Sequence, residues 1–171
     1  MQIEIEKSRI LHMHGVAELM YKIFNKFSCS NITKDEAYFL GLVHDIGYLY
    51  GKDGHEITGG HLLFGMSNFG VLNKMSDYVK YHELTPREYM EVNNCSASEI
   101  PNEMILLWYA NMCIESDGEL AGEEVGFDKR LESIKENYGE DSDYYKSSKE
   151  TIDWLREYSL IKNDAFLNKH V

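Results

Sequence analysis

Residues 41–47 read Gly-Leu-Val-His-Asp-Ile-Gly, so an apolar run ends in an imidazole, a carboxylate and a glycine. Burying His44 and Asp45 side by side costs free energy unless something pairs with them, and a bound metal ion is a common partner for adjacent histidine and aspartate. Further histidines precede and follow this stretch at helical positions from which they could converge on the pair. The stretch therefore predicts a metal site, and we expect that site to be catalytic.

The surrounding sequence predicts an all-α fold, because it has only two prolines and many apolar residues at helical spacing. Thr33 and Glu36 have the spacing of a capping box at the start of one helix, and Pro101 suits the first turn of another. We expect one domain over residues 1–171, folded as a single compact helical bundle. Its helices are expected at about residues 8–27, 34–47, 55–69, 72–82, 101–114, 127–138 and 142–160. Residues 47–54 and 116–126 are expected to be loops, and residues 84–100 a polar, irregular segment.

The composition restricts the possible partners. A net charge of -12 disfavours a surface for DNA or RNA, because the phosphate backbone would be repelled. A small phosphorylated molecule remains compatible, since a metal centre supplies its own positive charge. Cys29, Cys95 and Cys113 are odd in number and far apart, which suits reduced thiols in a cytoplasm. The charged first residues lack a signal core and no stretch has the length of a membrane span, so we expect a cytoplasmic protein without membrane contact.

Five side chains near the expected helix ends are the candidate metal ligands: His12, His44, Asp45, His55 and His82. Imidazole with carboxylate and without thiolate suits a divalent transition metal, as one or two ions of Fe, Mn, Zn, Ni or Co, better than a purely structural zinc. The remaining histidines are not expected to bind metal: His14, His61 and His170.

Several of these stretches together resemble the HD-domain superfamily of metal-dependent phosphohydrolases. The similarity covers about residues 9–140, and its two most specific parts are Arg9-x-x-His12-x-x-x-Val16-Ala17 and residues 41–47. Looser parts are His55-x-x-x-Gly59, Tyr81-His82, residues 106–111, Arg130-Leu131 and Tyr138-Gly139. The histidines after the motif resemble those of members that bind two metals, which include bacterial hydrolases of dinucleoside polyphosphates and cyclic-dinucleotide phosphodiesterases. The resemblance implies an HD-domain-like helical bundle.

The resemblance also implies which residues would bind metal. His12, His44, Asp45 and Asn111 would surround one ion, and Asp45 would bridge to a second ion held by His55 and His82. The chain departs from the family at Asn111, where the superfamily has an aspartate. An asparagine ligates through a neutral amide oxygen and is a poorer ligand for a hard cation. Glu115 or Asp117 reaching into the site is an alternative, although neither stands at the matching position.

If the chain is an enzyme, the expected reaction is hydrolysis of a phosphate ester or anhydride. Metal ions activate water and neutralise phosphate oxygens, and Asp45 would orient the nucleophile as well as bind metal. Lys52, Lys80 and Arg87 are the candidates for binding the remaining phosphate charge, because they lie close in sequence to the expected ligands.

The leading hypothesis is therefore a metal-dependent phosphohydrolase acting on a nucleotide or another small phosphorylated metabolite. One alternative is a degenerate HD-fold module that binds a nucleotide or metal without hydrolysis, as Asn111 would indicate. A second is a purely structural helical protein with incidental histidines. A third is oxygenation, which an HD site with two irons can support.

Overall fold

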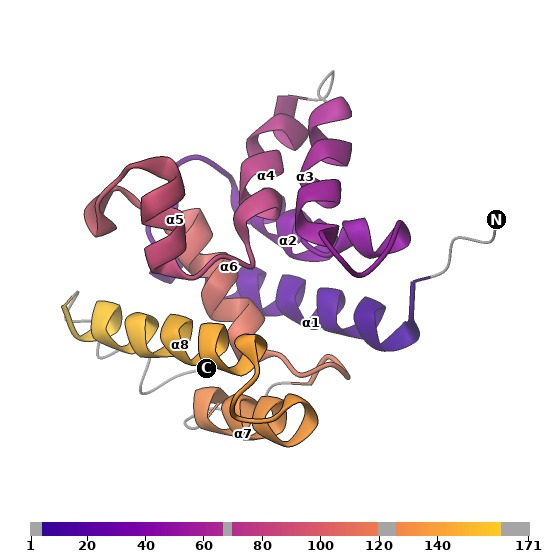
Figure 1. Ribbon diagram of the computed structural model, residues 1–171. Helices are drawn as coiled ribbons and strands as arrows, with labels where there is room; N and C mark the ends of the chain where they lie inside the picture. Colours follow the sequence, from indigo (N-terminus) through magenta and orange to yellow (C-terminus); the bar gives the residue numbers. More distant parts are fainter. Residues whose placement is uncertain (1–4, 67–69, 120–125, 162–171) are drawn as a thin grey trace.

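A helix that is buried along most of its length, α6 (Asn102–Cys113), runs through the centre of the molecule (Figure 1). Every residue from Glu103 to Ala110 is buried, as expected for a helix surrounded by others. The computed structural model describes residues 5–66, 70–119 and 126–161. In these ranges it contains eight α-helices and no β-strand, arranged as a compact helical bundle. The predicted all-α fold is confirmed.

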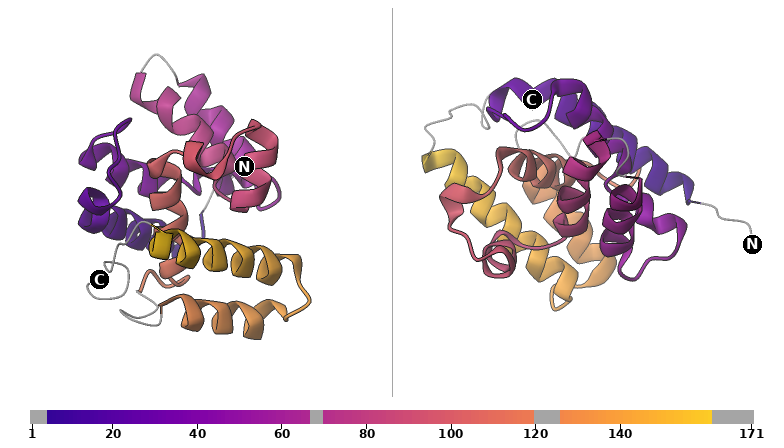
Figure 2. Two further views of the ribbon diagram at one scale, coloured as in Figure 1. Left: turned by 90° about the vertical axis from the view of Figure 1, so that its left-hand side faces the viewer. Right: turned by 90° about the horizontal axis from the view of Figure 1, so that it is seen from above.

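The other helices surround α6 largely as pairs. α1 (Lys7–Ile23) packs on α2 (Lys34–Val43), α3 (His55–Gly65) packs on α4 (Gly70–Tyr81), and α7 (Gly126–Tyr138) packs on α8 (Asp143–Ile161). The α7–α8 pair is seen side by side in the left view of Figure 2. The central helix contacts α1, α4, α7 and α8, and α5 (Pro86–Asn93) contacts α8. This arrangement brings the end of α2 beside α1.

The two helices that carry His12 and His44 meet at backbone distance. A Cβ atom built on Gly41 would lie 2.5 Å from the Cα of Ala17 and 2.7 Å from its backbone nitrogen. No side chain larger than a hydrogen therefore fits at Gly41 without pushing α1 and α2 apart. The short contact places the turn after α2 directly beside the face of α1 that bears His12.

The prediction of an irregular segment at residues 84–100 is wrong. Helix α5 occupies Pro86–Asn93, and a short 3-10 helix occupies Ala97–Glu99. Thr85 caps α5 through the Glu88 amide, and the Glu88 carboxylate accepts from the Thr85 amide, with Pro86 in the first turn. This is the same Thr-x-x-Glu capping box that correctly predicted α2 from Thr33, so the signal was present in the sequence.

Other boundaries shift by a few residues. The first helix ends at Ile23 and continues as a 3-10 helix at Phe24–Lys26. The second ends at Val43, before Gly47, and the expected loop 47–54 begins within a 3-10 helix at Ile46–Leu49. Residues 67–69 and 120–125, which fall in the predicted third helix and acidic loop, lie outside the described residues, as does His170. The three cysteines carry free thiols, and none of the described helices is long and apolar enough to cross a membrane.

The close contact at Gly41 makes a stability prediction. Gly41→Ala should lower the free energy of unfolding by about 1–3 kcal/mol, the usual cost of overpacking a tight interface. Gly65→Ala is the matched control, because it also places a methyl group on a helix and meets nothing within 4 Å. That control should leave stability unchanged or raise it by up to about 1 kcal/mol. Urea denaturation followed by circular dichroism measures both, and equal effects would contradict the assigned contact.

Candidate metal centre

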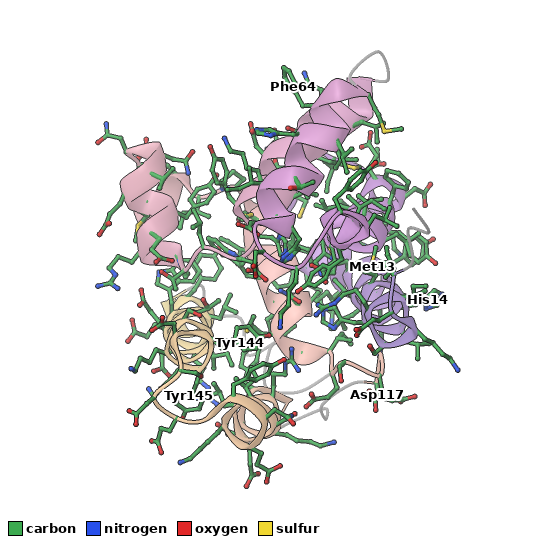
Figure 3. All side chains as sticks on the ribbon, turned by 45° about the vertical axis from the view of Figure 1, so that its right-hand side comes forward. Met13, His14, Phe64, Asp117, Tyr144 and Tyr145 are labelled. Atoms are coloured by element: carbon green, nitrogen blue, oxygen red, sulfur yellow. The ribbon has the colours of Figure 1, made fainter. Side chains whose placement is uncertain are left out.

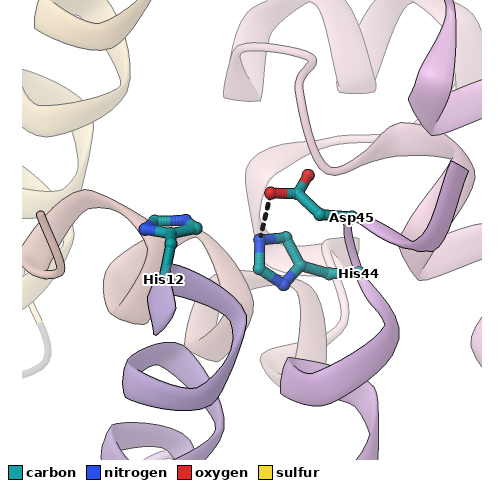
Figure 4. A group of neighbouring side chains, drawn as sticks. All are labelled: His12, His44 and Asp45. Atoms are coloured by element: carbon teal, nitrogen blue, oxygen red, sulfur yellow. Dashed lines mark ion pairs between the residues drawn. The ribbon is translucent and has the colours of Figure 1, made fainter. Parts of the chain in front are cut away.

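His44 and Asp45 lie at the junction between α2 and the 3-10 helix that follows it. His44 caps the end of α2, and Asp45 immediately precedes Ile46–Leu49, with φ -102° and ψ 14°. Because the α-helical path stops at Val43, the two adjacent side chains are not held on separate faces of one helix. Figure 4 shows both beside His12, with His44 Nε2 directed at the Asp45 carboxylate.

Four imidazole rings gather at this junction from four helices. His12 lies within α1, His44 at the end of α2, His55 is the first residue of α3, and His82 directly follows α4. Each of these rings, like Asp45, is at most 3 % exposed. The structure thus brings together all five side chains that the sequence proposed as ligands. His14 and His61 are exposed and lie outside the group.

Three of the rings turn one nitrogen towards the same carboxylate. Nε2 of His55 and Nε2 of His82 lie 3.0 and 3.3 Å from Oδ1 of Asp45. Nε2 of His44 lies 3.3 Å from Oδ2, but this buried atom makes no hydrogen bond. A buried nitrogen left in this way is costly unless another group completes the site.

The other nitrogen of each ring faces a backbone carbonyl. The four Nδ1-to-oxygen distances are 2.8 Å for His44 to Gly41, 3.0 Å for His55 to Lys52, 2.7 Å for His82 to Val79 and 3.2 Å for His12 to Glu115. A ring that donates Nδ1–H in its neutral form presents a lone pair at Nε2, which is the arrangement of metal-bound histidines. Lone pairs directed at a carboxylate repel it unless a proton or a cation lies between them. The donor set therefore fits a divalent ion.

The charges of the group favour a cation over protonation of every ring. Burial, with the neighbouring His44 ring, lowers the pKa of His12 to about 4, so His12 is neutral at neutral pH. Burial also opposes a charge on His82, but Asp45 raises the pKa of His82 above its usual value. Burial would raise the pKa of Asp45, yet His44, His55 and His82 hold it well below its usual range. The neutral ring of His12 and the ionised carboxylate of Asp45 are therefore both in the form that binds a cation.

Two groups of potential ligands share Asp45. His12, His44 and Asp45 form one, and Asp45, His55 and His82 form the other, with the ligand atoms of each within 4.8 Å of one another. These buried groups can hold a metal ion. A third group, His55 with Glu56 and Glu83, is more exposed and was not foreseen from the sequence.

Asn111 lies beside His12, as its place in the sequence pattern implied. Its Oδ1 is 2.8 Å from His12 Nε2, and Asn111 lines the cavity described below, as His12 does. The alternative ligands are not in the His/Asp groups of the described residues. The Glu115 carboxylate accepts a hydrogen bond from Arg130 at 2.9 Å, and the Asp117 carboxylate accepts one from the Glu119 amide.

Four members of the group, His12, Asp45, His55 and His82, line a cavity of about 520 Å³, whereas the fully buried His44 does not. Of the three proposed phosphate-binding residues, Lys52 lines this cavity, whereas Lys80 and Arg87 line a neighbouring groove. Lys80 binds the Tyr81 hydroxyl at 3.0 Å, and Arg87 binds Glu150 at 3.1 Å. The structure thus does not bring Lys80 or Arg87 to the His/Asp group.

Two arginines line the cavity instead, and sequence reasoning did not select either for substrate binding. Arg9 Nη1 lies 2.7 Å from Asp45 Oδ2, and its guanidinium stands over the Tyr48 ring at 4.1 Å. Arg130 comes from α7. Arg9 could have been found, because it stands three residues before His12 on one helix and so shares its face. Arg130 belongs to one of the looser parts of the resemblance, but sequence reasoning assigned it no role in the site.

Comparison of the chain with family models, with curated proteins and with solved structures finds no match.

The shared carboxylate predicts a pattern of metal content. Wild-type protein purified without chelator or histidine tag should carry about two transition-metal ions per chain. His82→Ala should retain the ion held by His12 and His44, whereas Asp45→Asn should lose both. His14→Ala, which removes an exposed histidine two residues from His12, should match the wild type. Elemental analysis of folded samples measures each value, and an unchanged content in Asp45→Asn would contradict the assignment.

Proposed function

We propose that this protein is a metal-dependent phosphohydrolase of small phosphorylated molecules, and a divergent member of the HD-domain superfamily. The observation that carries the proposal is the set of four imidazoles whose Nδ1 atoms face backbone carbonyls while their Nε2 atoms turn towards Asp45 or Asn111. Three of these histidines, His12, His55 and His82, line a cavity that admits a molecule of nucleotide or sugar-phosphate size.

The charge of the cavity supports a metal-assisted reaction on an anion. Four carboxylates line it, those of Asp45, Asp53, Glu56 and Glu83, against three cationic side chains, those of Arg9, Lys52 and Arg130. The side chains alone would not attract phosphate. One or two divalent ions held by the His/Asp group would reverse the sign of the charge there and allow a phosphoryl group to bind.

A bound divalent ion would supply activation of water and neutralisation of phosphate oxygens. The residues of the chain hold and orient the reactants. His12, His44, Asp45, His55 and His82 would hold the ions, with Asn111 beside His12, and Asp45 would orient the attacking water. The Arg9 guanidinium is fixed between Asp45 and the Tyr48 ring, so it can bind phosphate oxygens without first losing side-chain freedom.

The proposal is tested with p-nitrophenyl phosphate and bis(p-nitrophenyl) phosphate as generic substrates. Protein loaded with Mn²⁺, Fe²⁺ or Zn²⁺ should hydrolyse at least one of them, and a chelator should remove the activity. Asp45→Asn should lose the activity together with the metal, whereas His14→Ala should keep both. Protein that holds metal but hydrolyses neither ester, nor any of a panel of nucleotides and sugar phosphates, would exclude the hydrolase.

The second candidate is a binding module that has lost hydrolysis, and the neutral Asn111 favours it. Asn111→Asp distinguishes the two, because a carboxylate beside His12 adds a full negative charge to the first ligand group. If the site is a weakened hydrolase, the variant should bind more metal and raise kcat/KM by about tenfold or more, equivalent to about 1.4 kcal/mol of barrier. Tighter metal binding without any gain in turnover would favour the binding module.

A further inference from the structure

A partly exposed phenol, that of Tyr144, lines the same cavity as the candidate metal ligands. Tyr144 lies in the first turn of α8 and lines both the cavity and the neighbouring groove, so it stands where the two meet. It lies between the α7–α8 pair and the rest of the molecule in Figure 3. The charged groups that act on its hydroxyl are Arg130, Glu83 and Arg9, and Arg9 itself contacts Asp45.

The orientation of this hydroxyl follows from its one side-chain partner. Arg130 Nη2 lies 3.3 Å from the Tyr144 hydroxyl oxygen. A guanidinium has only donors, so the phenol oxygen accepts in this contact and its own proton remains available. No side chain in the described ranges accepts that proton. A phenol is protonated at neutral pH, so Tyr144 offers the cavity one hydrogen-bond donor.

Arg130 is itself held rigidly. Its side chain is 10 % exposed, and Nη1 donates to the Glu115 carboxylate at 2.9 Å. The backbone carbonyl of Glu115 faces Nδ1 of His12 at 3.2 Å. The same residue thus orients a candidate ligand through its main chain and the Arg130–Tyr144 pair through its side chain. His12 and the Arg130–Tyr144 pair are therefore both held in place by contacts with Glu115.

We propose that Tyr144 binds the substrate directly, by donating a hydrogen bond to a phosphoryl oxygen at the His/Asp group, and that Arg130 positions it. This inference rests on the proposed function, since it requires a phosphoryl group at that place. Phosphoryl oxygens are acceptors only, so the Tyr144 hydroxyl would add a hydrogen-bond donor to those that Arg9 can supply. Tyr144 is a substrate-binding residue, and Arg130 acts through it.

The test uses inorganic phosphate and the Mn²⁺-loaded protein. Tyr144→Phe removes only the hydroxyl. Tyr145→Phe is the matched control, because it makes the same change on the next residue, which lines neither the cavity nor the neighbouring groove. Metal content should be equal in all three proteins. Isothermal titration should show phosphate binding about tenfold or more weaker in Tyr144→Phe, the loss expected for a hydrogen bond to a charged group, and unchanged binding in Tyr145→Phe.

A double-mutant cycle tests the role of Arg130. Arg130→Lys cannot bind Glu115 and Tyr144 together, so it should weaken phosphate binding in the wild type and have little further effect in Tyr144→Phe. Fully additive losses would overturn the positioning role.

The outcomes separate this inference from the function on which it rests. Metal and phosphate binding that are equal in the wild type and Tyr144→Phe would overturn the role of Tyr144 and leave the phosphohydrolase standing. Equal weakening in Tyr144→Phe and Tyr145→Phe would overturn it too, because the effect would then come from α8 and not from a contact. A wild-type protein without metal or phosphate binding would overturn both proposals.

Discussion

The contact between the buried Asp45 carboxylate and the rings of His44, His55 and His82 constrains the rest of the structure, because none of these groups is stable in the interior alone. The carboxylate needs cationic or donor partners, and the rings need their Nδ1 protons accepted. Carbonyls at helix ends meet the second need, since they lack partners in their own helix. His44 and His82 each follow the end of a helix and use a carbonyl three residues earlier, whereas His55 uses the carbonyl of Lys52 in the preceding loop.

This requirement explains why three of the four histidines lie at helix ends and why backbones approach closely there. Gly41 lets α1 reach the end of α2. Gly47 likewise allows the start of α3 to approach the segment after Asp45, because a Cβ atom on Gly47 would lie 1.8 Å from the carbonyl oxygen of His55. Both glycines flank the His44-Asp45 pair in sequence. The stretch at residues 41–47 thus supplies two ligands and the two backbone contacts that bring His12 and His55 to them.

The sequence identified the side chains that cluster around Asp45 better than the cationic side chains that line the cavity, for a geometric reason. A buried histidine needs a hydrogen-bonding or charged partner. Several histidines near expected helix ends therefore suggest one shared buried site. Closeness in sequence is a poor guide to a cation on the same helix: Lys80 precedes His82 by two residues, and two residues along a helix turn the side chain by about 200°. Lys80 therefore faces the neighbouring groove. Arg130 and Tyr144 reach the cavity only because α7 and α8 fold back beside α6, and no local pattern encodes that packing.

Helix α5 was missed for a different reason. Its capping box was present in the sequence, but the surrounding segment is polar and was therefore taken as irregular.

The neutral side chain at Asn111 changes the balance between holding cations and attracting anions. With an asparagine beside His12, Asp45 is the only carboxylate in the two buried ligand groups. Two divalent ions would then carry four positive charges against one negative charge, and the excess would act on whatever enters the cavity. A second carboxylate would bind the ions more tightly and reduce that excess. Because the chain as a whole has a net charge of -12, a strongly positive centre is the feature that would let a phosphorylated molecule enter. With an asparagine at position 111, we therefore expect weaker binding of the ions and a larger positive charge available to an anion in the cavity.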